Sequence, residues 1–86
     1  MRGIGKRFVY VLRSAADRDR RYIGIASNVE ERLEWHNAGP CGYTREHRPW
    51  TVGVVIEFAT EREAVAFEKY LKSGSGRAFA KRHFCP

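Results

Sequence analysis

The fold is decided by residues 22–37, YIGIASNVEERLEWHN, which we interpret as a short strand, a sharp turn and an amphipathic helix. Arg32 and His36 are four residues apart, so the 3.6-residue period places them about 40° apart on one helix face. Val29 and Leu33 occupy the adjoining sector of this helix and should pack inward. Two polar side chains beside an apolar stripe suggest a functional site.

The flanking sequence predicts an α+β domain. Residues 8–12, FVYVL, are typical of a buried central strand, and residues 22–25 should pair with them as a hairpin. Residues 51–58, TVGVVIEF, should add a third strand beside this hairpin, after a loop over residues 41–49. We therefore expect a three-stranded, mostly antiparallel sheet flanked by helices, in the order β-β-α-β-α with a possible extra helix.

The helix that carries Arg32 has clear start and stop signals. Ser27 and Glu30 fit a capping box with Ser27 as the N-cap, and residues 38–40, AGP, should end the helix. Gly24, in the strand just before, has no side chain to pack. A glycine normally weakens a strand there, unless another backbone or a ligand must come close.

The later helix carries one polar residue on its apolar side. Residues 60–63, TERE, form a second capping box, and Glu68 falls about 40° from Ala64 on the core-facing side. A carboxylate in that position is costly unless a cation or hydrogen-bond donors meet it. Residues 73–76, SGSG, should end this helix, and residues 77–83 could form a last short one.

Composition and charge bound the function. The 86 residues, with 16 Lys and Arg against 10 Asp and Glu and a formal charge of +6, indicate one small domain over residues 1–86 and a polyanionic partner, nucleic acid first. No apolar run of about 18 residues and no signal peptide is visible, which favours the cytoplasm and no membrane association. Cys41 and Cys85 make no C-x-x-C pair, and their spacing to His47 and His83 does not fit a zinc finger.

Basic residues gather in the loop after residue 40 and in the C-terminal fifth, where no acid follows Glu68. We interpret them as nucleic-acid contacts, although an ordinary solvated surface is the alternative. Tyr43 could stack on a base, or simply lie in a surface loop. The candidate contacts are Arg45, Arg48, Lys69, Lys72, Arg77 and Lys81.

Five polar residues lie at positions where the sequence pattern predicts at least partial burial. Each of them also has a purely structural interpretation. Tyr10 and Tyr22 could be strand aromatics with one wet end, and Arg32 could pair with an exposed acid. His36 could be a packed or capping histidine, and Glu68 could form an i,i+4 ion pair with the lysine one turn on.

Taken together, these residues resemble the GIY-YIG nuclease signature, in the form of a small stand-alone member related to the N-terminal nuclease of UvrC-type excision-repair endonucleases. The resemblance spans about residues 8–79 and implies a divalent-metal-dependent endonuclease, with Mg²⁺ or Mn²⁺, that cleaves a nucleic-acid phosphodiester. We expect DNA as the substrate, in repair or recombination, with RNA left open. It implies that Glu68 binds the metal, that Arg32 steadies the scissile phosphate, and that one tyrosine helps to deprotonate the attacking water. The implied catalytic set is Tyr10, Tyr22, Arg32, His36 and Glu68.

Three positions depart from the family pattern. Phe8-Val9-Tyr10 replaces Gly-Ile-Tyr, Ile25 stands where the excision-repair branch often has lysine, and no asparagine follows Glu68. A non-catalytic nucleic-acid-binding module of the same fold is therefore the alternative function, and a protein-interaction domain is a third. A monomer or a weak homodimer is expected, because cutting both strands at once would need two copies of so small a nuclease.

Overall fold

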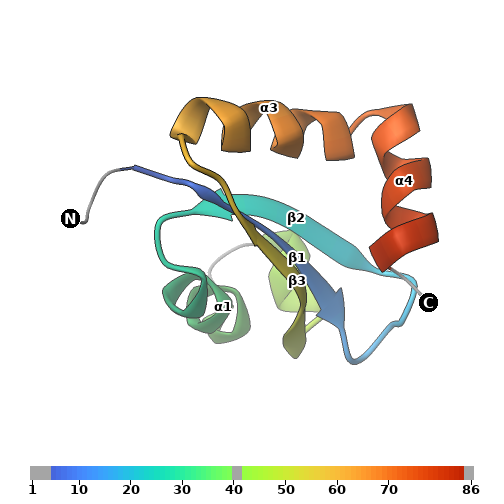
Figure 1. Cartoon of the computed structure of the whole chain (residues 1–86). Helices are drawn as coiled ribbons and strands as arrows, with labels where there is room; N and C mark the ends of the chain where they lie inside the picture. Colours follow the sequence, from blue (N-terminus) through green and yellow to red (C-terminus); the bar gives the residue numbers. More distant parts are fainter. Residues whose placement is uncertain (1–4, 40–41, 85–86) are drawn as a thin grey trace.

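The computed structural model describes residues 5–39 and 42–84, which form three strands and four helices. The chain order is β-β-α-α-β-α-α, which confirms the predicted α+β fold and adds one short helix (Figure 1). The strands are β1 (Phe8–Ser14), β2 (Arg21–Ala26) and β3 (Trp50–Glu57). The helices are α1 (Val29–Ala38), α2 (Gly42–Glu46), α3 (Glu61–Leu71) and α4 (Gly74–Phe84).

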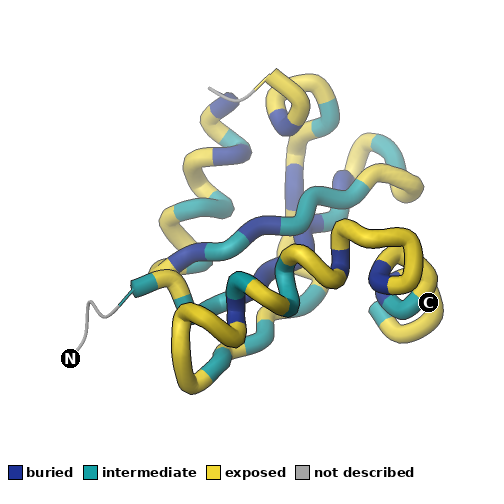
Figure 2. Tube along the Cα trace, turned by 90° about the horizontal axis from the view of Figure 1, so that it is seen from above, coloured by how far each residue is buried: buried dark blue, intermediate teal, exposed yellow. Residues whose placement is uncertain are grey.

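The sheet has the strand order β2-β1-β3, with β1 antiparallel to both neighbours. The predicted hairpin and the predicted central position of residues 8–12 are both confirmed. Residues 9–12 are at most 3% exposed, because helices cover both faces of the central strand. Figure 2 shows this concentration of buried chain along the middle of the molecule.

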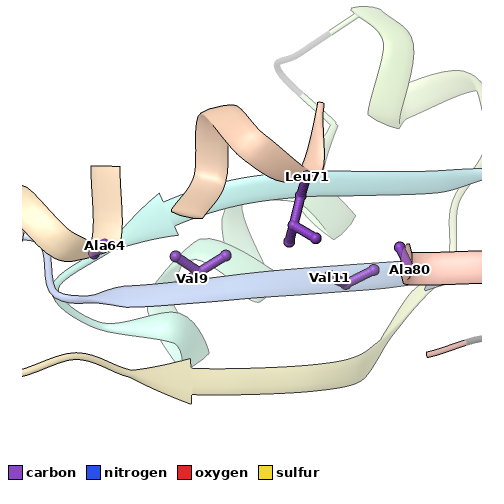
Figure 3. Close-up of a cluster of buried hydrophobic side chains, with 5 residues drawn as sticks. All are labelled: Val9, Val11, Ala64, Leu71 and Ala80. Atoms are coloured by element: carbon purple, nitrogen blue, oxygen red, sulfur yellow. The ribbon is translucent and has the colours of Figure 1, made fainter. Parts of the chain in front are cut away.

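Alternate residues of β1 belong to two separate apolar clusters, one on each face of the sheet. Val9 and Val11 pack with Leu71 of α3 and Ala80 of α4 on one face, and Figure 3 shows Leu71 directed from its helix toward the strand. On the other face, Tyr10 and Leu12 pack with Trp50, and Val29 and Leu33 of α1 close this second cluster. The period of 2 in a strand thus sends β1 side chains into both layers.

Two of three predicted helix termini are confirmed, and the third differs by one residue. The N-cap of α1 is Asn28, whose Oδ1 accepts from the Glu31 backbone N–H at 3.1 Å, so the prediction of Ser27 was wrong by one residue. Asparagine caps a helix as well as serine does, so two adjacent candidates left the start ambiguous. Gly39 ends α1 with φ of 95°, and Thr60 caps α3 by accepting from the Glu63 N–H at 3.2 Å, both as predicted.

Helix α2 lies in the segment that we expected to be a loop, so that expectation was wrong for residues 42–46. Five residues carry no detectable period, and tertiary contacts hold them instead. Thr44 is fully buried, and its carbonyl accepts a hydrogen bond from the Trp50 indole N–H at 2.7 Å. Cys41 lies outside the described residues.

The last helix begins earlier than the glycines suggested. Residues 74–76 belong to α4, and α3 already ends at Leu71, so the prediction that residues 73–76 only terminate a helix was wrong. Ser73 supports this start, because its Oγ accepts from the Gly76 N–H at 3.2 Å. A Cβ on Gly76 would overlap the Tyr70 carbonyl, so glycine permits the close approach of the two helices.

Candidate active site

Tyr10 of the central strand β1 lies opposite Gly24 of β2, which is an edge strand of the sheet. The two residues are paired in the antiparallel register, and Tyr10 is only 1% exposed. A Cβ on Gly24 would overlap the Tyr10 hydroxyl. The group that comes close to Gly24 is therefore the phenol of the first motif tyrosine, and neither a backbone nor a ligand is needed to explain the glycine.

This packing predicts a large effect for Gly24→Ala. The added methyl group must displace the Tyr10 phenol, and overpacking a closed site typically costs about 1–3 kcal/mol of unfolding free energy. We expect that loss in urea denaturation, together with an altered Tyr10 environment in tyrosine fluorescence. Gly74→Ala is the matched control, because its Cβ would meet nothing within 4 Å. Wild-type stability and fluorescence for Gly24→Ala would show that Tyr10 is not confined there.

His36 joins Tyr10 to the buried base of the site. Its Nε2 lies 3.2 Å from the Tyr10 Oη and its Nδ1 lies 3.1 Å from the Thr44 Oγ1, with all three side chains essentially inaccessible. Burial, and then the positive charge of Arg32, lower the pKa of His36 below its ordinary value of about 6.5. The imidazole is therefore neutral near pH 7, with one nitrogen donating and the other accepting.

Tyr22 completes an aromatic cluster around this hydrogen bond. Its ring centroid is 4.4 Å from that of His36 and 6.3 Å from that of Tyr10. Both tyrosines come from neighbouring strands and point to the same face, while His36 approaches from α1. Residues from three elements thus meet at one edge of the sheet.

Arg32 lies on the same face of α1 as His36, one turn earlier, as the period predicted. Its guanidinium carbon is 4.1 Å from the centroid of the Trp35 ring, a cation–π contact that restricts the side chain. Burial raises the pKa of Tyr10, whereas a hydrogen bond with Arg32 and its positive charge lower that pKa. Arg32 therefore stands beside the hydroxyl on which the chemistry of the site would depend.

Glu68 lies on α3, which covers the face of the sheet opposite to the face that Tyr10 and α1 occupy (Figure 1). Its carboxylate adds a smaller upward contribution to the pKa of Tyr10, which places it within electrostatic range of that phenol. The Glu68 side chain is 16% exposed, and its Oε2 is 2.6 Å from the Lys72 Nζ. The carboxylate on the core-facing side of the helix thus has the cation that its burial demanded, supplied one turn later.

The donor set at Glu68 fits a hard divalent cation. Mg²⁺ typically takes one or two carboxylates and fills its remaining positions with water and substrate phosphate oxygens. Glu68 offers one carboxylate that already faces a cation, the Lys72 ammonium. Across residues 5–39 and 42–84 no group of three or more His, Cys, Asp or Glu side chains could hold a metal.

The six basic residues proposed as nucleic-acid contacts lie on or next to α2, α3 and α4. The Arg48 Nη1 donates to the carbonyls of Asn37 and Ala38, each at 3.3 Å, at the C-terminal end of α1. Lys72 forms an ion pair with Glu68, and both Lys72 and Arg77 line one cleft. The remaining three, Arg45, Lys69 and Lys81, are exposed.

Two supporting residues escaped the sequence analysis. The Thr44 hydroxyl contacts Nδ1 of His36. The Asn37 side chain holds the backbone of Trp50, because its Oδ1 accepts from the Trp50 backbone N–H at 2.6 Å and its Nδ2 donates to the Trp50 carbonyl at 3.1 Å. Neither residue lies on a periodic apolar stripe, so no sequence signal separated them from surface polar residues. Of the four residues considered for a zinc finger, the two cysteines lie outside the described part of the chain.

Comparison with known proteins agrees with this geometry. Residues 6–82 match the GIY-YIG catalytic domain. The chain is similar to a UPF0213 protein of Bacillus licheniformis, with 40% identity over 52 residues, 59% of this chain and 54% of that protein. The match thus spans about half the length of that relative. No solved structure matches significantly, and within the described residues no helix is long and apolar enough to cross a membrane. Because the match to the GIY-YIG catalytic domain covers most of the sequence, the chain belongs to the GIY-YIG family.

Proposed function

We propose that this chain is a divalent-metal-dependent endonuclease that hydrolyses phosphodiester bonds of DNA, of the repair or recombination type, and acts in the cytoplasm as one domain over residues 1–86. The observation that carries the proposal is the meeting of Tyr10, Tyr22 and His36, with Arg32 and Glu68 within electrostatic range of Tyr10. These five residues come from four elements, and the two most distant, Tyr10 and Glu68, are 58 positions apart in the sequence.

Arg32 and Glu68 supply the charge chemistry. Hydrolysis adds negative charge to the non-bridging oxygens of the phosphate, and a guanidinium can meet two of them at once. Glu68 would hold the Mg²⁺ or Mn²⁺. A metal ion bound there would offset the same charge and lower the pKa of a coordinated water.

Tyr10 and His36 offer a route for the proton of the attacking water. Tyr10 is protonated near pH 7, because the ordinary pKa of a tyrosine is about 10 and burial raises the pKa of Tyr10 further, so it cannot simply act as a phenolate. With Nδ1–H of His36 donated to Thr44, Nε2 is free to take the Tyr10 proton as the phenol oxygen accepts one from water. The resulting hydroxide forms a bond to phosphorus, and the phosphorus–oxygen bond to the leaving group breaks. The leaving oxygen keeps the electron pair of that bond and takes a proton from solvent, while His36 carries the proton of the attacking water.

The test is cleavage of labelled DNA and RNA, single-stranded, duplex and branched, with Mg²⁺ or Mn²⁺ and with EDTA. We expect metal-dependent cutting of DNA by the wild-type chain. Arg32→Met should reduce the rate by roughly 10²–10³-fold, as expected when one donor to the transition-state oxygens is lost. Arg62→Met, an exposed arginine in the first turn of α3, should cut like the wild type.

Two outcomes separate the alternatives. Retention of DNA without cleavage in any metal would favour the non-catalytic binding module, to which the Glu68–Lys72 pair lends some support because it engages the carboxylate. Equal cleavage by the wild type and Arg32→Met would contradict the proposed site. Cleavage confined to RNA would correct the substrate while keeping the site.

A further inference from the structure

A cleft of about 400 Å³ opens directly beside the candidate active site, between the β1–β2 hairpin, α2 and the start of α4. Figure 1 shows α4 standing at the hairpin end of the sheet. We propose that this cleft, here named the hairpin cleft, binds the nucleotide of the substrate strand next to the cleaved phosphodiester. The inference rests on the proposed nuclease function and adds where the strand runs. Its defining residues are Arg20, Arg21, Tyr22, Tyr43, Lys72 and Arg77.

The hairpin cleft is continuous with the active site, because two residues belong to both. Tyr22 lines the cleft, and its ring packs 4.4 Å from the His36 ring. Lys72 lines it from the other side, and its Nζ lies 2.6 Å from the Glu68 carboxylate. A strand whose phosphate reaches Glu68 and Arg32 therefore passes directly from the reacting atoms into the cleft.

The charge of the cleft fits a phosphate backbone. Four cationic residues line it against one acid, Asp19. Arg20 forms an exposed ion pair with Asp17 at 3.4 Å, a contact weak enough to exchange for a phosphate. Arg77 is exposed on α4, on the side of the cleft away from the hairpin. Cations on both walls are the arrangement that follows a polyanionic strand.

Tyr43 gives the cleft an aromatic surface for a base. Its side chain is 40% exposed, and its hydroxyl donates to the Arg21 carbonyl at 3.3 Å, which fixes the ring against the hairpin. The Tyr43 and Tyr22 ring centroids lie 6.5 Å apart at 34°, so the two rings form adjoining faces. Tyrosine faces bordered by arginines are the usual platform for an unpaired base, and pockets of a few hundred Å³ suit ligands of that size.

The first test is binding of short fluorescent DNA and RNA strands and of a duplex to the full chain. Binding is measured by anisotropy in EDTA, where the strand is not cut, over a series of salt concentrations that begins at low salt. Tyr43→Leu should weaken strand binding at least fivefold, the lower limit for losing one stacked base, whereas Tyr43→Phe keeps the ring and most of the affinity. Arg77→Met should weaken binding several-fold and reduce its salt dependence.

Matched controls lie outside the cleft. Tyr70 is also 40% exposed, but its ring packs on Phe67 and Phe79, so Tyr70→Leu should bind like the wild type. Arg62→Met removes an arginine from α3 without touching the cleft. A second measurement needs no variant: a strand carrying 5-iodouracil, irradiated on the wild-type chain, should cross-link to Tyr43 or Tyr22.

The outcomes distinguish this proposal from the proposed function. Should the wild type bind and cut nucleic acid while the cleft variants bind like their controls and the cross-links map elsewhere, the hairpin cleft is not the binding site and the nuclease proposal stands. Should no strand bind at any salt concentration, both proposals fail. Weaker binding by the cleft variants alone, with cross-links at the tyrosines, supports the cleft.

Discussion

Glu68→Gln should abolish metal-dependent cleavage, with a loss of at least about 100-fold. The substitution keeps the size of the side chain and removes the charge that a divalent cation requires. The fold should survive, because the Glu68–Lys72 pair that is lost is an i,i+4 contact on a helix, which contributes only about 0.2–0.5 kcal/mol. The measurements are the cleavage rate and Mn²⁺ binding by electron paramagnetic resonance, with urea denaturation to check stability.

The control for this variant is Glu34→Gln, which removes an exposed carboxylate from α1 and should leave both cleavage and Mn²⁺ binding unchanged. Full activity of Glu68→Gln would exclude Glu68 as the metal ligand. Loss of cleavage with unchanged Mn²⁺ affinity would contradict the assignment in a different way, since the carboxylate would then act on the substrate rather than on the metal.

The proposed function requires that a metal ion displace the Lys72 ammonium from Glu68. Lys72 is half exposed, so solvent screens its attraction to the carboxylate and leaves the pair weak. A divalent cation carries twice the charge of an ammonium group and brings phosphate oxygens as further partners. Once displaced, Lys72 faces the hairpin cleft that it already lines, where a substrate phosphate can take the place of Glu68.

The sequence predicted the framework of this site because periodic patterns determine which side a residue faces. The four-residue spacing of Arg32 and His36 put both on one face of α1, the hairpin formed where expected, and the two capped helices began within one residue of their predicted starts. The apolar stripe of α3 likewise placed Glu68 on its inner side, where it needed a cation. These predictions depend only on geometry within one element or between adjacent strands.

What the sequence did not reveal depends on contacts between distant elements. Thr44 is buried because the short helix α2 packs against α1 and brings the Thr44 hydroxyl to the His36 Nδ1. A helix of five residues is too short to show an apolar period in the sequence. The role of Gly24 was expected to involve a backbone or a ligand, whereas the structure fills the space with the Tyr10 phenol. The hydrogen bonds from the Arg48 Nη1 to the carbonyl end of α1 were not expected either. Each of these depends on side-chain length and on tertiary packing.

Tyr10→Phe should lower the cleavage rate by roughly 10²–10⁴-fold, the range for losing a positioned proton-transfer group. The hydroxyl is the atom that His36 Nε2 contacts at 3.2 Å, so its removal breaks the proposed proton route at its first step. Stability should fall by about 1–3 kcal/mol, because a buried imidazole nitrogen is left without its partner. Steady-state cleavage rates and urea denaturation measure the two effects, with Tyr70→Phe as the control.

The pH dependence of cleavage tests the same route through His36. Burial and Arg32 lower the pKa of His36, so the neutral imidazole that accepts the Tyr10 proton persists to pH values below 6.5. The wild-type rate should therefore hold near pH 6.5 and fall only at lower pH, when the imidazolium can no longer accept a proton. His36→Gln should lose this acid limb together with most of the rate. If Tyr22→Phe is instead far more damaging than Tyr10→Phe, the proton passes through the second tyrosine, and the Tyr10–His36 hydrogen bond serves to position the site.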